Sequence, residues 1–145
     1  TEPRRVFFTS VFAEGWALYC EELMWEEGFY SDPRVRLLQL KDLLWRACRV
    51  VVDVGLHVRG WSIDQAVDYM VEEAGLERAN AEVEVRRYCV EPTQPLRYAV
   101  GRREILRLRQ LAQERLGSRF GLRAFHDNLL SWGTIPPALI LRTTF

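Results

Sequence analysis

The stretch Val11-Phe-Ala-Glu-Gly-Trp-Ala-Leu-Tyr-Cys-Glu-Glu-Leu23 decides the fold of this chain. Its apolar residues recur every three or four positions, which predicts an α-helix with one face toward a core. A carboxylate, Glu14, stands inside this apolar run, and its burial is costly unless it is paired, hydrogen-bonded or bound to a metal. Gly15 beside it costs a helix about 1 kcal/mol relative to alanine, which suggests that another backbone or a ligand comes close. We therefore expect Glu14 either to pair with an arginine of a neighbouring helix or to belong to a functional site.

The remaining residues predict an all-α fold, a compact bundle of about six helices. The first helix is expected to end before Gly28, and the second to run from Pro33 to about His57. Further helices are expected at about 61–75, 79–90, 96–116 and 122–132, followed by a short helical turn after 135. Ser62 and Gln65 have the spacing of a capping box, and a short extended link is expected at 91–96. Residues 1–145 form either a single domain or the C-terminal segment of a longer one.

A line of polar residues runs along the second helix, whose second half, residues 43–56, is otherwise apolar nearly all round. This polar line consists of Gln39, Asp42, Arg46, Arg49, Asp53 and His57. Spacings of three and four place its members on one helix face. The apolar surroundings predict a central, buried helix, so the line is either a solvated face, with Asp53 paired to Arg49 or His57, or the wall of a cavity. We expect Glu14 and the part of the line from Arg46 to His57 to open onto one cavity or exposed concave face.

Composition excludes several classes of function. Twenty basic and twenty acidic residues give a net charge of zero, so we expect no nucleic-acid partner and no anionic membrane surface. No apolar run approaches the roughly 18 residues that span a bilayer. Three widely spaced cysteines, Cys20, Cys48 and Cys89, predict buried free thiols and a cytoplasmic location. With only two histidines, His57 and His126, the chain cannot build a histidine-rich metal site alone.

Five segments resemble a known bacterial family. Glu14-Gly-Trp-Ala-Leu-Tyr19 resembles the Glu-Gly-Trp-Ala-x-Tyr signature of the family called domain of unknown function 885. Pro92-Thr-Gln-Pro-Leu-Arg-Tyr-Ala-Val-Gly101, which follows Arg87-Tyr88, resembles its Pro-Gly-Gln-Ala-x-x-Tyr-x-x-Gly segment. The other similar segments are 46–57, 60–66 and 125–136. The similarity covers nearly the whole chain.

The resemblance implies a zinc peptidase-like protein of the gluzincin type. Longer members carry a His-Glu-x-x-Pro-Gly-His-like helix before the Glu-Gly-Trp-Ala segment, and their later glutamate is the third zinc ligand, a role that falls on Glu14. No histidine precedes His57, so this metal helix is absent from the sequence. The chain thus resembles the C-terminal, third-ligand and substrate-binding portion of a zinc metallopeptidase or amide hydrolase. We expect zinc in the complete parent but none in the isolated chain, which would be inactive; the alternative is a non-catalytic helical interaction module.

Three residues are candidates for a role in catalysis. Tyr88 and Tyr98 could donate hydrogen bonds to an oxyanion, and Tyr98 stands at the tyrosine position of the family segment. His126 could stabilise a transition state or orient a ligand. Alternatively, both tyrosines only pack with their hydroxyls at the surface, and His126 pairs with Asp127.

Three further residues are candidates for binding a peptide-like or small amide substrate. Arg87 could hold a substrate carboxylate, although pairing with Glu84 or Glu91 is the expected alternative. Gln94 stands at the glutamine of the family segment. His57 could instead stabilise the end of its helix through the helix dipole.

Loss of the metal helix should leave an apolar surface uncovered. The candidates on and before the first helix are Phe7, Phe8, Phe12 and Trp16. Contiguous apolar patches are rarely exposed on monomers. We therefore expect this surface to be covered by a second copy of the chain, in a dimer or higher oligomer, or by an upstream segment or separate chain that carries the metal helix.

Overall fold

All regular structure in the described part of the chain is helical, as the sequence predicts. The computed structural model describes residues 7–144, with side chains to residue 140. Its elements are α2 (Ser10–Glu26), α3 (Pro33–Val58), α4 (Ile63–Glu72), α5 (Arg78–Val90), α6 (Leu96–Leu116), the 3-10 helix η1 (Gly117–Arg119), α7 (Leu122–Ser131) and α8 (Pro137–Thr144). The expected helices therefore exist, and their boundaries agree within a few residues. No helix in this part of the chain is long and apolar enough to cross a membrane.

The helix ends follow from local chemistry. The side chain of Asp32 accepts a hydrogen bond of 2.9 Å from the Arg34 amide at the start of α3, where Pro33 occupies the first turn. At the start of α4, Ser62 and Gln65 form the expected capping box, each side chain bonded to the other residue's amide. Gly28 ends the α2 segment with a φ of 73°, a left-handed conformation that glycine adopts without strain.

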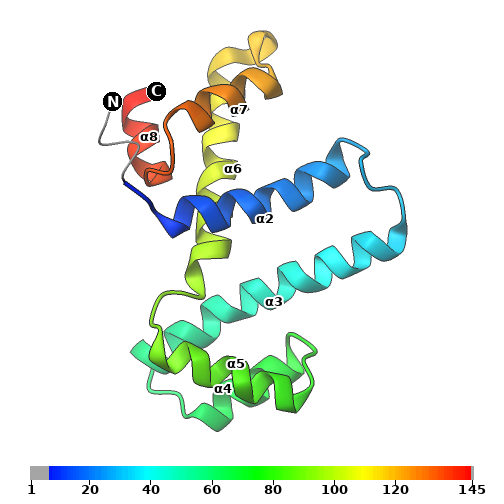
Figure 1. Cartoon of the computed structure of the whole chain (residues 1–145), viewed down its shortest axis with the longest axis vertical. Helices are drawn as coiled ribbons and strands as arrows, with labels where there is room; N and C mark the ends of the chain where they lie inside the picture. The colour runs from blue at the N-terminus through cyan, green and yellow to red at the C-terminus, as the bar shows by residue number, and fades with distance from the viewer. Residues whose placement is uncertain (1–6, 145) are drawn as a thin grey trace.

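The helices form two lobes joined by α2, α3 and α6 (Figure 1). α2 and α3 form a hairpin, and α6 packs across α2 and reaches α3 at its N-terminal end. The upper lobe, with α7 and α8, buries Phe12, Tyr19, Leu23, Ile105, Leu108, Ala112, Phe125, Leu129 and Ile140. The lower lobe, with α4 and α5, buries Cys48, Val52, Ala66, Val67, Met70, Ala74, Ala81, Val85 and Tyr88. Each lobe thus has its own apolar core.

Gly15 allows α2 and α6 to touch backbone to backbone. A Cβ placed on Gly15 would overlap the backbone of Gly101 and would lie 2.7 Å from the Arg102 nitrogen. A Cβ on Gly101 would lie 2.8 Å from the Gly15 Cα and would overlap the Val11 carbonyl oxygen. The prediction that another backbone approaches Gly15 is confirmed, and the crossing fixes the position of Glu14.

Two predictions about exposure were wrong. Within residues 43–56 of α3, only one side is buried, and Leu44 and Val51 are exposed because α2, α4, α5 and α6 leave that face open. Phe12 is not part of an uncovered surface, since it lies in the upper core, and Trp16 packs against the same core. Phe7 and Phe8 are exposed as expected.

Candidate functional site

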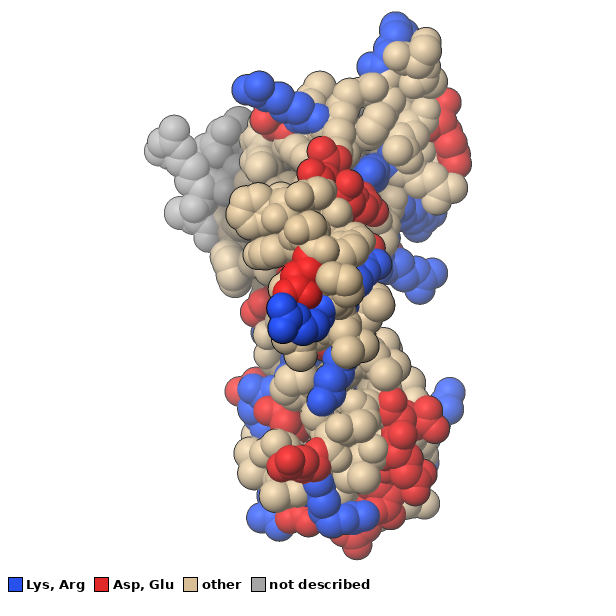
Figure 2. Space-filling model, turned by 90° about the vertical axis from the view of Figure 1, so that its right-hand side faces the viewer, with Lys and Arg blue, Asp and Glu red and all other residues tan. Residues whose placement is uncertain are grey.

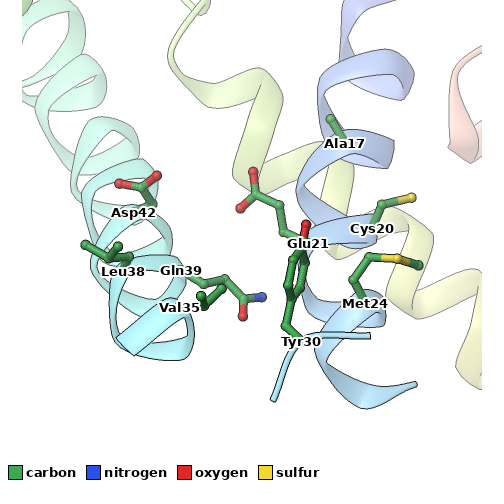
Figure 3. Close-up of a pocket in the computed structure, with 9 residues that line it drawn as sticks. All are labelled: Ala17, Cys20, Glu21, Met24, Tyr30, Val35, Leu38, Gln39 and Asp42. Carbon is green, nitrogen blue, oxygen red and sulfur yellow. The ribbon is translucent and has the colours of Figure 1, made fainter. Parts of the chain in front are cut away.

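The candidate site lies on α2, α3 and α6, which carry Glu14, the polar line and Tyr98. A pocket of about 390 Å³ opens between α2 and α3 (Figure 3). Its lining residues are Ala17, Cys20, Glu21, Met24, Tyr30, Val35, Leu38, Gln39 and Asp42. Figure 3 shows the carboxylates of Glu21 and Asp42 on opposite walls, with Tyr30 at the lower end. The pocket therefore combines an apolar lining with acidic groups on both helices.

Glu14 lies on the face of α2 that continues this wall. It precedes Glu21 by seven residues, two helical turns, so that the two carboxylates project in nearly the same direction about 10 Å apart along the axis. The Glu14 side chain is half-buried, and none of residues 7–140 forms a hydrogen bond or ion pair with it. Pairing with an arginine of a neighbouring helix, the structural alternative for Glu14, is therefore not found in the described part of the chain.

Arg46 and Arg36 connect the two walls of the α2–α3 hairpin. Arg46 of α3 lies 3.7 Å from Glu21 of α2 and 3.4 Å from Asp42 of its own helix. Arg36 makes two 2.9 Å hydrogen bonds to the Glu22 carboxylate, which lower the pKa of that carboxyl below its ordinary value. Glu21 differs, because burial raises its pKa despite the Arg46 charge. The pocket thus contains two carboxylates that share one cation, and its net charge is negative.

The second half of the polar line does not face this pocket. Arg49 and Asp53 are 7% and 3% exposed and find their partners inside the protein, although the buried Nε atom of Arg49 has no hydrogen-bond partner among the described residues. The Arg49 guanidinium lies 3.2 Å from Glu84, and Asp53 accepts hydrogen bonds from the Thr93 amide. Residues Gln39 and Asp42 line the pocket, whereas the line beyond Arg46 is an internal network. The expectation that Glu14 and the Arg46–His57 part of the line share one cavity or concave face is therefore wrong beyond Arg46, because partners from α5 and from the turn before α6 bind Arg49 and Asp53.

The turn before α6 also corrects an expectation. Residues 91–96 form a turn rather than an extended link, and Thr93 adopts a φ of 69°. The Asp53 carboxylate holds this turn through the Thr93 amide, at 3.0 Å. A proline restricts only the residue before it, so Pro92 leaves Thr93 free to turn, and the Asp53 side chain, 40 residues away, binds its amide.

The two candidate tyrosines lie beside Arg49 but differ in their surroundings. The Arg49 guanidinium carbon is 5.7 Å from the Tyr88 ring centre and 5.4 Å from that of Tyr98. Tyr88 is fully buried and donates a 2.6 Å hydrogen bond to Glu84, and burial raises its pKa to about 12. Tyr98 is half-buried, and no described residue hydrogen-bonds its hydroxyl. Of the two, Tyr98 is the one whose hydroxyl is free to bind a ligand.

His126 lies in the upper lobe, away from these tyrosines. Its Nε2 atom is 2.8 Å from the Tyr19 hydroxyl, which also accepts a 3.4 Å hydrogen bond from Arg109. Burial, and secondly the Arg109 charge, lower the pKa of His126 below its ordinary value. The expected His126–Asp127 pair is not formed: Asp127 pairs with Arg123 on the surface of α7, at 3.8 Å.

The candidate substrate-binding residues lie around the Arg49 network. Arg87 donates a 2.6 Å hydrogen bond to Glu84, as the structural alternative predicted. The His57 Nε2 atom lies 3.1 Å from the Tyr88 carbonyl oxygen and 3.8 Å from Asp53. Gln94 is half-buried in the turn before α6. The fold thus brings together Tyr88, Tyr98, Arg87 and His57, places Gln94 at their margin, and separates them from His126.

Sequence reasoning named Arg46 and Glu84 but missed the roles by which they organise the site. The Glu84 carboxylate accepts hydrogen bonds from Arg49, Arg87 and Tyr88. Arg46 of α3 bridges the pocket walls through Glu21 of α2. Glu21 could have been found, because it repeats Glu14 two turns later on one face. The bond from Glu84 to Arg49 could not, since the two residues are 35 positions apart in the sequence.

Zinc is the metal that the sequence resemblance implies, and Glu14 is the residue to which the resemblance assigns the role of ligand. A half-buried carboxylate without a described partner can serve as one oxygen ligand. Among the residues that the structure describes, no group of three His, Cys, Asp or Glu could hold a metal ion. The chain therefore offers one ligand, and a complete site would need the others from a different polypeptide segment.

The surface shows no strong preference for one sign of charge. Figure 2 shows acidic side chains gathered over part of the lower lobe, with basic and acidic groups interspersed above. This distribution agrees with the zero net charge and gives no sign of a basic nucleic-acid surface on the face shown.

Two solved structures share the fold of this chain. The first is "the putative lipoprotein from Colwellia psychrerythraea", with 42% identity and a TM-score of 0.91 over 96% of this chain and 24% of that one. The second is a "putative lipoprotein of unknown function from Shewanella oneidensis", with 35% identity and a TM-score of 0.90 over 95% of this chain and 26% of that one. The chain thus spans about a quarter of the length of these relatives. The comparison with curated proteins gave no match.

The family comparison covers almost every residue. Residues 1–143 match the family described as "Bacterial protein of unknown function (DUF885)". The Glu-Gly-Trp-Ala segment lies on α2, and the segment from Pro92 to Gly101 forms the turn and first residues of α6, so that the two are joined at the Gly15–Gly101 crossing. The chain belongs to this bacterial family of unknown function.

Proposed function

We propose that this chain is the third-ligand and substrate-binding portion of a zinc-dependent metallopeptidase or related amide hydrolase. Glu14 is the ligand it contributes, and the histidine ligands and general base come from a helix outside these 145 residues. The observation that supports this most strongly is the Glu14 carboxylate, half-buried beside the α2–α6 crossing and without a described partner. A carboxylate withdrawn from water is stabilised by pairing, by hydrogen bonds or by a bound metal, and the first two are not found for Glu14 in the described part of the chain. Three protein ligands would leave a zinc position open for a water molecule.

Tyr98 is the residue we assign to the reacting carbonyl. Its hydroxyl has no described hydrogen-bond partner, and its ring lies beside Arg46 and Arg49. One helical turn before Gly101, it lies on the part of α6 that meets α2 near Glu14. A phenol in this place can donate a hydrogen bond to a developing oxyanion. Three further residues position the site without facing the substrate. Tyr88 and Arg87 bind Glu84, and His57 binds the Tyr88 carbonyl oxygen.

The test uses a chimera in which this chain replaces the matched segment of the Colwellia psychrerythraea protein. Release of free amine from a panel of short N-blocked peptide amides should require zinc. Tyr98→Phe should lower kcat by about 100-fold with a small change in KM, since one donor to an oxyanion contributes roughly 10²–10³. Tyr69→Phe, which alters a tyrosine of α4 packed against the lower core and away from the pocket, is the control. A zinc-loaded chimera that hydrolyses no amide, or a Tyr98→Phe variant as active as the parent, would contradict the proposal.

The cellular location stays a prediction. Unpaired cysteines favour the cytoplasm, and Cys48 is a buried free thiol. The two solved relatives are described as lipoproteins, which would instead place the family at a membrane surface. Fractionation of cells that produce the complete parent protein separates the two: we expect it in the soluble cytoplasmic fraction, and recovery with membranes would contradict this.

A further inference from the structure

α3 carries an apolar stripe on the face that its neighbours leave open. We call it the α3 seam; it consists of Leu37, Leu40, Leu44, Ala47, Val51, Val54 and Val58. Its five most exposed leucines and valines are between 37% and 77% exposed, Ala47 is exposed, and Val54 is half-buried. α2, α4, α5 and α6 pack against the other sides of this helix. The seam is therefore an unpartnered face over most of a 26-residue helix.

The spacing of the seam indicates what covers it. Its members follow one another at intervals of three, four, three, four, three and four residues. This repeat of 3.5 residues is that of positions a and d in a coiled coil, which interlock with the side chains of a second helix at a crossing angle near 20°. From Leu37 to Val58 the seam is about 32 Å long, so that a partner helix of about 20 residues would cover it.

Charges beside the seam constrain the partner further. Lys41 and Arg59 are exposed near opposite ends of the seam, and no described residue forms an ion pair with either side chain. A partner helix with acidic residues beside its own apolar stripe would complement them. A second copy of α3 would instead bring basic groups to the same interface.

The comparisons supply a source for such a helix. The solved relatives reproduce this fold with TM-scores of 0.91 and 0.90, yet the matched segments are only 24% and 26% of their chains. We propose that the α3 seam binds an amphipathic, acidic-flanked helix from the other three quarters of the family protein. This interface lies on α3 rather than on the first helix, and it does not depend on the proposed zinc chemistry.

The experiment compares the isolated chain with the chimera. Leu37→Glu with Leu44→Glu places two charges in the seam, and Val83→Glu with Val90→Glu makes the same changes, seven residues apart, at exposed positions of α5. In the isolated chain, both pairs should change Tm by less than about 2 °C, because all four side chains face solvent. In the chimera, the seam pair should lower Tm by about 5 °C or more, whereas the α5 pair should leave it within about 2 °C.

Three results would overturn the proposal. Equal effects of the two pairs in the chimera would mean that the seam is not covered selectively. A second copy of the chain would be the partner if the seam pair leaves the Tm of the chimera unchanged and the isolated chain sediments as a dimer that the seam pair converts to a monomer. If the doubly substituted chimera does not fold, Leu44→Ala takes its place: it should lower the chimera's Tm and leave that of the isolated chain unchanged, and equal shifts in both would refute the proposal.

Discussion

The backbone amide of Thr93 donates to both oxygens of the Asp53 carboxylate, at 3.0 and 3.3 Å. This contact joins the C-terminal part of α3 to the turn before α6, in which Thr93 has a φ of 69°. A β-branched residue is strained in that left-handed conformation. The family segment that this turn resembles has glycine at the same place, which would adopt the conformation without strain.

We expect Thr93→Gly to stabilise the chain. Relief of the left-handed strain should stabilise the folded state by about 1–3 kcal/mol. Glycine also has more conformational freedom in the unfolded chain, which cancels part of this gain. The free energy of unfolding in urea should therefore rise by about 1 kcal/mol. Thr134→Gly, at an ordinary position in another loop, should lower it. A loss of stability in Thr93→Gly would show that the turn is not strained.

Gly15→Ala should destabilise the protein although alanine favours a helix. The new methyl group would overlap the backbone of Gly101, which cannot move aside as a flexible side chain would. The overlap should outweigh a gain of about 1 kcal/mol in helix propensity and lower the free energy of unfolding by about 2–3 kcal/mol. Gln113→Ala, on the exposed side of α6, should change it by less than about 0.5 kcal/mol. Equal stabilities would mean that α2 and α6 are farther apart than described.

His126 should make stability depend on pH. Burial and the Arg109 charge lower its pKa in the folded state, so that the unfolded chain takes up a proton first as the pH falls. The stability that neutral His126 contributes is fully present above the ordinary histidine pKa of 6.5. It is lost as the pH falls from there through the folded-state pKa.

Urea unfolding of the parent and of His126→Gln, measured at intervals from pH 8 to pH 5, checks this. The difference between the two free energies of unfolding should be constant above pH 7.5. At lower pH the free energy of unfolding of the parent should fall relative to that of the variant. Parallel curves over the whole range would contradict the assignment.

Local patterns predicted most of the fold because helix ends depend on nearby residues. Pro33, the Ser62–Gln65 capping box and Gly28 lie within a few residues of the ends they define. Gly15 also indicated a close approach by another backbone or a ligand, and the structure shows that it is the backbone of Gly101.

Long-range pairings were not predictable in the same way. His126 forms a hydrogen bond with Tyr19, which lies 107 residues earlier in the sequence, rather than with its neighbour Asp127. Thr93 and Asp53 are 40 residues apart, and their contact turns an expected extended link into a turn. Phe12 was expected on an uncovered surface because the metal helix is missing from the sequence. Periodicity shows which side of α2 is apolar, but it does not show that this side lies in the upper core.

Zinc content tests the central claim, that Glu14 is the metal ligand this chain contributes. The chimera, purified without chelator, should contain about one zinc ion per chain, and the isolated chain should contain little or none, since one carboxylate cannot replace the other ligands. Glu14→Gln should remove most of the zinc from the chimera, whereas Glu21→Gln, two turns along the same face, should retain it. A Glu14→Gln chimera with its full zinc content, or an isolated chain that holds zinc stoichiometrically, would contradict the account.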